Sequence, residues 1–400
     1  MKVLVLNSGS SSVKYQLIET SLELMAEDRD RTLARGAVER IGEVVPDHAE
    51  AIRIALESLA RQRAIRDLDE IDAVGHRMVH GAEHFGEPVL IDDAVVARIE
   101  ECASLAPLHN PHNLTAYYAT RRLLPRAAHV AVFDTAFHRS LPPKAYTYGL
   151  PHDVCRRHRL RRYGFHGTSH RYVAERFAKL HGKPFSEFKL ITCHLGNGCS
   201  MCAIDRGKSV DTTMGLTPLE GLLMGTRAGD TDPAAALHIM KWERLNAEQM
   251  DSLLNNQSGL LGISGLSNDM RTLLECRRRG DERARLAVDV FCYRIRKYIG
   301  AYFAALNGAD AVIFTAGIGE NAPEIRALAC DSLDALGIRI DPSRNESAIA
   351  AEADISAGGA ATRVWVIPTN EELLICRDAV RCIAQAGAPP SIESGGGPPG

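Results

Sequence analysis

Short apolar runs that end in glycine-rich or polar segments recur along this chain, and such runs are typical of buried β-strands. Apolar side chains at consecutive positions indicate burial on both faces of a sheet, as in proteins that combine a largely parallel sheet with helices. We predict strands at Lys2–Leu6, Val13–Ile18, Ala73–Val79, Val130–Phe133, Lys189–Leu195, Cys199–Ile204, Lys208–Thr212, Ala311–Thr315 and Arg363–Ile367.

Helical periodicity occupies several of the segments between these strands. It is clearest over 281–306, where large apolar residues recur at three- to four-residue steps, and Gly308 is placed to follow the helix end. The recurring residues are Phe291, Ile295, Tyr298, Tyr302 and Leu306. We predict further helices at Asp92–Leu105 and at Ser169–His181, the second with Ser169 as its N-cap.

The same strand–turn–strand layout starts twice, about half a chain apart. The first copy turns through Asn7-Ser8-Gly9-Ser10, and the second turns around Asn197-Gly198, a strong hairpin signal. A third strand follows the second copy after Asp205-Arg206-Gly207. Such recurrence indicates internal duplication, and it predicts two related α/β domains.

Composition and charge narrow the classes of partner that we expect for this chain. The chain has 400 residues, a net charge of -3 and 45% hydrophobic residues, which is ordinary for a globular protein of two or three domains. No apolar run approaches the ~20 residues of a membrane span, and the apolar start breaks too soon for a signal peptide. The basic run at 156–162 lacks interleaved aromatic residues, so we expect a solvated helix face. We therefore expect a cytoplasmic protein with no nucleic-acid or membrane partner, and a disordered Gly/Pro-rich tail at 386–400.

Three glycine-rich loops that follow strands indicate a nucleotide site. They are Asn7–Ser12, Gly196–Gly198 and Gly317–Asn321. Glycine and serine let backbone N–H groups turn toward an anion such as a phosphate. No GxxxxGK[ST] motif is present, which excludes a P-loop. The third loop also fits the GxGxxA form of a dinucleotide fingerprint, but that reading leaves the two earlier loops unexplained.

Three basic residues stand where they can bind anions. Lys14 follows the first loop and is either a phosphate contact or a solvated surface lysine. Arg77 and Arg227 lie in glycine-punctuated segments, and arginine suits bidentate binding of carboxylate or phosphate. Together they indicate a small anionic substrate, although either one alone fits a structural ion pair equally well.

Four further residues are candidates for chemistry. His109 and His166 each lie in a turn, and His166 directly precedes a predicted helix N-terminus, where anions bind. Asp134 follows a strand at the position where α/β active sites lie, or it caps a helix. Glu371 either helps to hold Mg²⁺ or is a first-turn helix glutamate.

Nine motifs, in order, resemble those of the acetate kinases, which belong with the short-chain carboxylate kinases in the sugar kinase, Hsp70 and actin superfamily. The resemblance covers about residues 2–384, with Ala82, Cys199 and Ala228 as small-for-small departures from the usual pattern. The motifs are LNSGSSSVKY, GHRMVHG, APLHNP, VAVFDTAFH, RYGFHGTSH, HLGNG, MGTRAGDTDP, FTAGIGEN and PTNEE.

The resemblance implies an α/β fold of two ribonuclease-H-like domains, as in actin and hexokinase, with a nucleotide cleft between them. It places the first domain at 1–150, completed by a C-terminal helix at 371–385, and the nucleotide-binding domain at 151–370. It also implies reversible phosphoryl transfer from ATP to acetate, giving acetyl phosphate and ADP, with Mg²⁺ or alternatively Mn²⁺, in a homodimer.

The resemblance also assigns roles to residues. Asp134, His166 and Arg227 correspond to the catalytic residues, and Asn7 and Glu371 to the magnesium site. The substrate-binding set is Arg77, Val79, Leu108, His109, Phe165 and Pro218, in which Val79, Leu108, Phe165 and Pro218 wall the pocket for the acetate methyl group. The ATP-binding set is Ser10, Ser12, Lys14, His194, Leu195, Gly196, Asn197, Gly198, Asp269, Met270, Arg271, Gly317, Ile318, Gly319, Glu320 and Asn321.

Three alternatives to an acetate kinase remain open on the residues alone. A propionate or butyrate kinase differs by methylene groups in an apolar pocket, worth only ~1–3 kcal/mol each. An actin- or Hsp70-like nucleotide switch needs no carboxylate site, so the paired arginines and His166 argue against it. A sugar kinase needs a polar pocket, whereas Val79 and Phe165 suit a methyl group.

Overall fold

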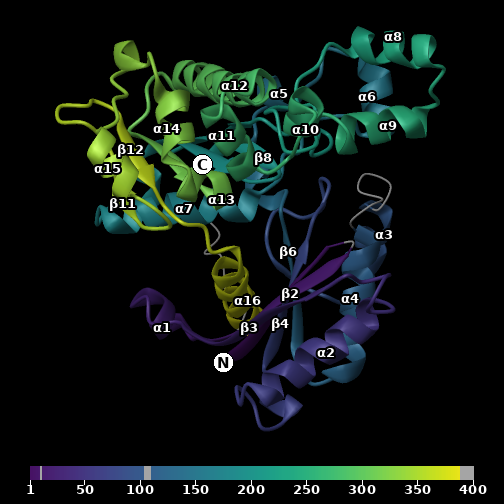
Figure 1. Cartoon of the computed structure of the whole chain (residues 1–400). Helices are drawn as coiled ribbons and strands as arrows, with labels where there is room; N and C mark the ends of the chain where they lie inside the picture. The colour runs from purple at the N-terminus through teal and green to yellow at the C-terminus, as the bar shows by residue number, and fades with distance from the viewer. Residues whose placement is uncertain (10, 103–109, 388–400) are drawn as a thin grey trace, which may run out of the picture. The chain divides into compact units, whose positions relative to one another are not determined.

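The computed structural model describes residues 1–9, 11–102 and 110–387. The chain forms two compact units, residues 1–133 with 372 onward, and residues 134–371 (Figure 1). The first boundary lies between Phe133 and Asp134, whereas the sequence predicts it near residue 150. No helix among the described residues has both the length and the apolar composition needed to cross a bilayer.

Unit 1 contains a six-stranded mixed sheet in the order β3-β2-β1-β4-β6-β5. The first three strands form an antiparallel meander, and β4 and β6 continue parallel to β1. Its strands are β1 (Lys2–Ser8), β2 (Ser12–Glu19), β3 (Arg31–Glu39), β4 (Ala73–Met78), β5 (Val89–Leu90) and β6 (Ala128–Phe133). Its helices are α1 (Leu22–Ala26), α2 (His48–Arg61), the 3-10 turn η1 (Leu68–Glu70), α3 (Asp93–Glu101), α4 (Asn110–Leu123) and α16 (Glu371–Gly387).

Both faces of the unit 1 sheet are buried, which explains the uninterrupted apolar run of β1. Leu4 and Leu6 pack with residues of α2 and α4 on one face. Val3 and Val5 pack on the opposite face against α16 (Figure 1). The C-terminal helix therefore completes the core of the first 133 residues, and it extends to Gly387, two residues into the predicted tail. Residues 388–400 of that tail lie outside the described residues.

Unit 2 repeats the same strand order with a second six-stranded sheet, β11-β12-β10-β7-β8-β9. Strands β7, β8 and β9 form the antiparallel meander, and β10 and β12 run parallel to β7. The duplication that the hairpins predict is thus present in the topology. The strands are β7 (Lys189–Leu195), β8 (Cys199–Asp205), β9 (Lys208–Thr212), β10 (Ala311–Thr315), β11 (Ala353–Asp354) and β12 (Arg363–Val366).

Helices cover the unit 2 sheet and supply its core. The predicted helix α12 (Glu282–Leu306) is confirmed, and the apolar stripe is buried except for Tyr298, whose hydroxyl donates to Asp230 Oδ2 at 2.6 Å. The other helices and 3-10 turns are η3 (Ala136–Ser140), α5 (Pro143–Tyr146), α6 (His152–His158), α7 (Gly167–Leu180), η4 (Phe185–Glu187), α8 (Pro233–Glu243), α9 (Ala247–Asn256), α10 (Gly259–Ser264), α11 (Met270–Arg278), α13 (Ala316–Asn321), α14 (Pro323–Cys330), η5 (Asp334–Leu336) and α15 (Pro342–Ser347).

Two local predictions are wrong. Ser169 does not cap its helix, because α7 begins two residues earlier with His166 at the N-cap position. The third glycine-rich segment is not a loop: α13 starts directly after β10, at Ala316. A tertiary contact fixes the start of α7, since the Gly167 N–H donates to Asp134 O at 2.9 Å. A contact within α13 fixes its start, since the Ala316 N–H donates to Glu320 Oε1 at 2.7 Å.

Candidate active site

His166 and Arg227 meet at the turn between β7 and β8. A Cβ atom built on Gly198 would lie 3.5 Å from both Arg227 Nη1 and His166 Cε1, and 3.6 Å from His166 Nε2. The two side chains therefore flank one glycine of the predicted HLGNG segment. The structure thus brings together two residues that lie more than 50 positions apart in sequence and that the family resemblance assigns as catalytic.

The backbone around His166 is held in an unusual conformation. His166 has φ 56°, in the left-handed region that non-glycine residues rarely adopt. Gly167 follows, and a Cβ atom there would lie 2.3 Å from Asp134 O, so only glycine permits this close approach. Asp134 itself is 1% exposed, at the end of β6. The start of α7 is thus fixed against the Asp134 backbone.

Arg227 is half-buried and contacts neutral acceptors. Its Nη1 lies 3.3 Å from Pro218 O and 3.8 Å from Met224 Sδ. Burial lowers the pKa of the Arg227 guanidinium from its ordinary value. A partly desolvated cation with a carbonyl and a thioether as acceptors is favourable when an anion completes its surroundings. Pro218, expected in the pocket wall, contributes its carbonyl oxygen to holding Arg227.

The loop that carries Arg227 rests on a half-buried ionic network. Arg162, at the end of the basic run, pairs with Glu220 at 2.5 Å and donates to the carbonyl oxygens of Thr212, Thr213 and Met214. The expectation of a solvated basic face therefore fails for Arg162. Tyr148 donates to Glu220 Oε2 at 2.5 Å, and burial, more than this bond, raises the pKa of Tyr148.

A large cleft in unit 2 contains much of the predicted ATP-binding set. Its volume is about 1620 Å³. Eight predicted residues line it: Gly196, Asn197, Asp269, Met270, Arg271, Gly317, Ile318 and Asn321. His194, Leu195, Gly198, Gly319 and Glu320 are not among the lining residues. Further lining residues were not predicted, because they come from segments without a glycine signal; they include Leu274, Arg278, Arg339, Ile340, Asn345 and Glu346.

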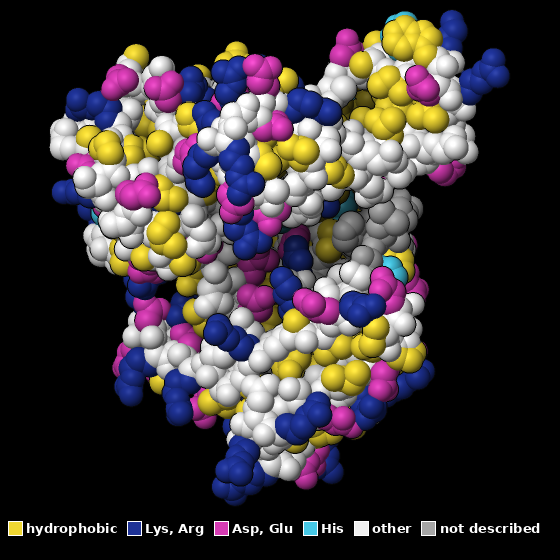
Figure 2. Space-filling view, viewed as in Figure 1, with side chains coloured by type: hydrophobic (Ala, Val, Ile, Leu, Met, Phe, Trp, Pro, Cys, Tyr) yellow, Lys and Arg dark blue, Asp and Glu magenta, His cyan; other side chains and the backbone are white. Residues whose placement is uncertain are grey.

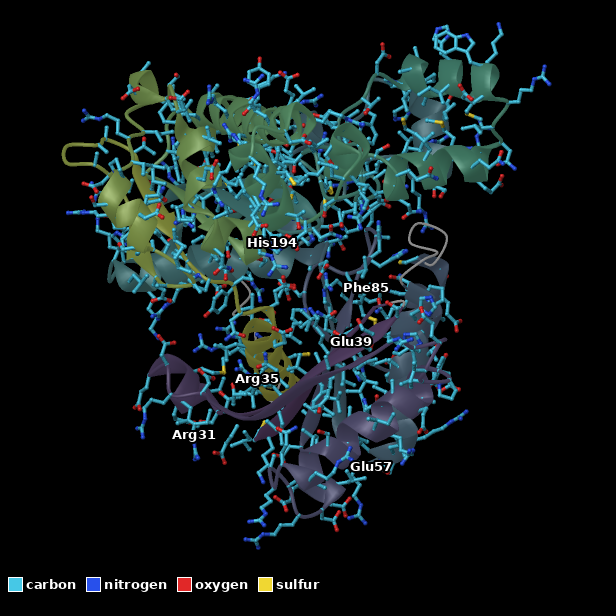
Figure 3. All side chains as sticks on the ribbon, viewed as in Figure 1. Arg31, Arg35, Glu39, Glu57, Phe85 and His194 are labelled. Carbon is cyan, nitrogen blue, oxygen red and sulfur yellow. The ribbon has the colours of Figure 1, made fainter. Side chains whose placement is uncertain are left out.

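Glu320 and His194 serve the interior of unit 2. Glu320 Oε1 accepts from the backbone N–H groups of Ala316 at 2.7 Å and Thr369 at 3.0 Å. It thereby ties α13 to the segment that leads into Glu371, the first residue of α16. His194, labelled in Figure 3, stacks on His166 with ring centroids 4.1 Å apart, and its Nδ1 lies 2.7 Å from Ser169 Oγ.

Within unit 1, three predicted residues gather at one end of adjacent strands. Arg77 Nη1 donates to Asn7 Oδ1 at 2.9 Å across the parallel pair of β4 and β1. Lys14 pairs with Asn7 in the β1–β2 hairpin, and its side chain is exposed. The Asn7 amide oxygen therefore already accepts one hydrogen bond, a constraint on any role as a metal ligand.

Val79, another unit 1 candidate, is positioned by a side chain that was not predicted. Val79 follows β4, is 8% exposed, and donates its N–H to Asn113 Oδ1 at 3.2 Å. Asn113 Nδ2 donates in turn to Ser8 O at 2.7 Å, which links the first loop to Val79. Ser12 starts β2. Ser10, Leu108 and His109 lie outside the described residues.

Known proteins that are similar in sequence to this chain include acetate kinases. The chain matches the acetokinase family over residues 2–377. It is 50% identical over 404 residues to the acetate kinase of Halothermothrix orenii, covering 96% of this chain and 100% of that one. The acetate kinase of Thermotoga petrophila is 49% identical over 409 residues, covering 97% and 100%.

Two solved structures are similar over nearly the whole chain. Porphyromonas gingivalis acetate kinase superposes with a TM-score of 0.90 at 43% identity, covering 96% of this chain and 99% of that one. A propionate kinase from Francisella tularensis gives 0.87 at 37% identity, covering 95% and 99%. With this sequence similarity and the repeated mixed sheets, the chain belongs to the acetokinase family.

Proposed function

We propose that this protein catalyses the reversible transfer of the γ-phosphoryl group of ATP to acetate, giving acetyl phosphate and ADP. Membership of the acetokinase family supports the reaction. One structural observation carries the proposal. The half-buried Arg227 and His166 lie beside Gly198. Gly198 belongs to the β7–β8 hairpin, and Gly196 and Asn197 of the same hairpin line the large cleft.

The chemistry needs positioning and charge neutralisation more than proton transfer. Acetate is already ionised at neutral pH, so a carboxylate oxygen attacks phosphorus without a general base. The new carboxylate–phosphorus bond forms while the bond from phosphorus to the β–γ bridging oxygen breaks, and ADP leaves with the electron pair. The barrier is the repulsion between an anion and a polyphosphate, and fixed cationic and N–H groups lower it.

Residue roles follow from this requirement. Arg227 and His166 contact the transferring phosphoryl oxygens, and Arg77 binds the acetate carboxylate, whose methyl group lies against Val79, Leu108, Phe165 and Pro218. Asp134 orients the cationic groups instead of removing a proton, because the nucleophile has none to lose. The cleft-lining residues hold the nucleoside, with Lys14 and the first loop as phosphate contacts.

The residues that the family resemblance assigns to the metal site, Asn7 and Glu371, carry oxygen ligands that suit Mg²⁺. Magnesium prefers a few protein oxygens together with water and phosphate oxygens, as one amide and one carboxylate would provide. Because Asn7 Oδ1 already accepts from Arg77, we assign Glu371 the stronger role and Asn7 a contact through water. When bound, the cation screens charge on the β and γ phosphate oxygens; Mn²⁺ is the alternative metal.

A hydroxylamine-trapping assay tests the proposal. Purified protein is incubated with MgATP, hydroxylamine and, separately, acetate, propionate, butyrate or glycerol, and hydroxamate and ADP are measured. We expect hydroxamate, greatest with acetate. More hydroxamate from a longer acid would make the protein a propionate or butyrate kinase. ADP without hydroxamate from glycerol would indicate a sugar kinase, and bound ATP without any product would indicate a nucleotide switch.

We further propose a cytoplasmic homodimer. All ten cysteines are free thiols, as is usual in a reducing compartment. Helix α8 has no buried residue, and it exposes 67% of Leu237 and 71% of Trp242. Figure 2 shows hydrophobic side chains gathered over this part of unit 2, whereas charges of both signs are interspersed over the visible face. Exposed apolar patches of this kind mark protein contacts, and a second copy of the chain is the occupant we propose.

Replacement of Trp242 by glutamate is therefore expected to convert the dimer to a monomer, because a charge cannot be buried in an apolar contact without a partner. The mass in solution, measured by light scattering after size-exclusion chromatography, checks this. Tyr293→Glu is the matched control, since Tyr293 is 56% exposed on α12. An unchanged mass for Trp242→Glu, or an equal loss of dimer in the control, would contradict an interface through α8.

A further inference from the structure

The face of β7 and β8 that packs against α7 changes from apolar to polar toward the β7–β8 turn. Leu190 and Ile204 lie in the core with Val173 and Phe177 of α7. Closer to the turn, the same face carries Thr192 opposite Cys202 and His194 opposite Ser200. His170 projects from α7 one helical turn after His166, so both rings lie over this polar end.

A continuous chain of short hydrogen bonds runs from the sheet to His166. Thr192 Oγ1 lies 2.7 Å from His170 Nδ1, His170 Nε2 lies 2.8 Å from Ser200 Oγ, and Ser200 Oγ lies 2.9 Å from His166 Nδ1. Thr192, His170 and Ser200 are each 0% exposed. Removal from water holds the pKa of His170 well below its ordinary value, so its ring is neutral and carries one proton.

Counting protons leaves two arrangements for this chain. A neutral imidazole donates from one nitrogen and accepts at the other, and each hydroxyl has one proton to give. Ser200 Oγ could also accept from both imidazoles, but its own proton would then have no acceptor among the described residues, which is costly for a 0% exposed hydroxyl. The three bonds therefore point the same way, either from Thr192 toward His166 or from His166 toward Thr192. In the first arrangement, Ser200 Oγ donates its proton to His166 Nδ1. In the second, His166 Nδ1 carries a proton and donates it to Ser200 Oγ.

The acceptor available to the Thr192 proton decides between the two arrangements. When the chain points toward His166, the Thr192 hydroxyl donates to His170 at 2.7 Å, and the protons of Thr192, His170 and Ser200 each have a close acceptor. When it points the other way, the Thr192 proton has Cys202 O at 3.5 Å as its acceptor. Hydrogen bonds of that length are weak, and a poorly satisfied buried donor is costly. The first arrangement is therefore the stable one.

We propose that Thr192, His170 and Ser200 form a polarised relay that holds the neutral form of His166 as the tautomer with its proton on Nε2. The proposal rests on the assigned role of His166 in phosphoryl transfer. Ser200 and His170 are then positioning residues: they act through His166, and they fix both its ring orientation and the nitrogen that carries its proton.

The relay places the N–H group of the His166 ring on Nε2, on the side where we assign the transferring phosphoryl group. His166 Nε2 and Arg227 Nη1 both lie beside Gly198. Stacking on His194, whose Nδ1 is itself held by Ser169, limits tilting of the ring. With Nδ1 accepting from Ser200, the Nε2 proton can be donated to a phosphoryl oxygen without net protonation of the imidazole.

Nitrogen NMR of the unmodified protein tests the tautomer independently of activity. The protein is labelled with ¹⁵N-histidine, and long-range ¹H–¹⁵N correlations are recorded at pH 8, with His166 identified by the signals missing from His166→Gln. We expect a proton on Nε2 and none on Nδ1. A proton on Nδ1, alone or together with one on Nε2, would overturn the proposal, whatever the hydroxylamine assay shows about the reaction.

Kinetics of Ser200→Ala test the positioning role. Loss of the hydroxyl frees the ring, and kcat is expected to fall about tenfold, equivalent to about 1.4 kcal/mol in the barrier, with KM for ATP and acetate within twofold of the parent. Ser200→Thr retains the hydroxyl and should recover most of kcat.

The matched control is Ser209→Ala. Ser209 is 0% exposed and makes the same kind of bond, 2.8 Å to Nδ1 of His138, on a histidine outside the relay. It should lose thermal stability to a similar degree while kcat stays within twofold of the parent. An unchanged kcat in Ser200→Ala, or an equal fall in Ser209→Ala, would show that the hydroxyl is only structural; if Ser200→Ala does not fold, Ser200→Thr and the NMR result decide.

Discussion

Replacing Arg227 with alanine is expected to lower kcat by a factor of about 10² to 10³ or more, on the order of 3 kcal/mol in the barrier. The guanidinium is held in place before the reaction by Pro218 O at 3.3 Å and by its packing in the loop. Such a preorganised cation stabilises charge that develops in the transition state without paying for reorientation at that moment. Steady-state kinetics in the direction of acetyl phosphate formation measure the loss.

Two variants make the Arg227 result specific. Arg227→Lys keeps the charge but loses the planar fork, so it should recover only part of the activity. Arg157→Ala, at an exposed arginine on α6, removes a charge of the same sign and should leave turnover unchanged. Near-normal kcat in Arg227→Ala would remove this residue from the mechanism.

Replacing Arg326 with methionine is expected to lower the free energy of unfolding by about 3 to 5 kcal/mol. Arg326 is 0% exposed, and burial lowers its pKa to about 10. Its guanidinium donates to Gly319 O, Glu320 O, Asn345 Oδ1, Asn345 O and Ala348 O, at 2.8 to 3.1 Å. Methionine fills similar space but donates none of these bonds; Glu320 O and Asn345 O keep one backbone donor each, from Ala350 and Ala348, and the other acceptors lose the Arg326 donor. Urea denaturation measures the cost.

Binding should respond as well, because Arg326 joins α13 to α15, which carries the cleft residue Asn345. We expect a higher KM for ATP with little change in KM for acetate. Arg344→Met, at an exposed arginine of α15, is the control and should alter neither stability nor KM appreciably. A stable Arg326→Met protein with an unchanged KM for ATP would show that the hydrogen bonds around Arg326 are dispensable.

The buried strands were predictable, whereas the edge strand β3 was not. β7 and β10 have the bounds that their apolar runs predict, since burial on both faces leaves a clear signal. β9, at the edge of the unit 2 sheet, was predicted from the Asp205-Arg206-Gly207 turn before it. β3 was missed because it lies at the sheet edge and is largely exposed. Its Arg31, Arg35 and Glu39, labelled in Figure 3, are charges of the kind that protect an edge from pairing with another chain.

Some residues of the candidate site were likewise predictable from the sequence, and others were not. Glycine-rich segments and isolated arginines mark where backbone and charge face a ligand, and His166, Arg227 and Gly198 do come together. Residues that act through buried hydrogen bonds, such as Ser200 and Arg326, have no local pattern, because their partners are distant in sequence. Glu320 shows the converse: it lies in a nucleotide-type motif, yet its carboxylate is engaged with backbone N–H groups.

The C-terminal helix that completes the first core also sets an order for synthesis on the ribosome. Residues 1–133 cannot cover Val3 and Val5 until Ile375 and Ala379 have been made, and all of residues 134–371 come first. At about 5–20 residues per second, that wait is on the order of tens of seconds. Unit 2, whose chain is continuous, can fold before unit 1 is complete, and the nascent unit 1 sheet keeps one apolar face available to chaperones throughout that interval.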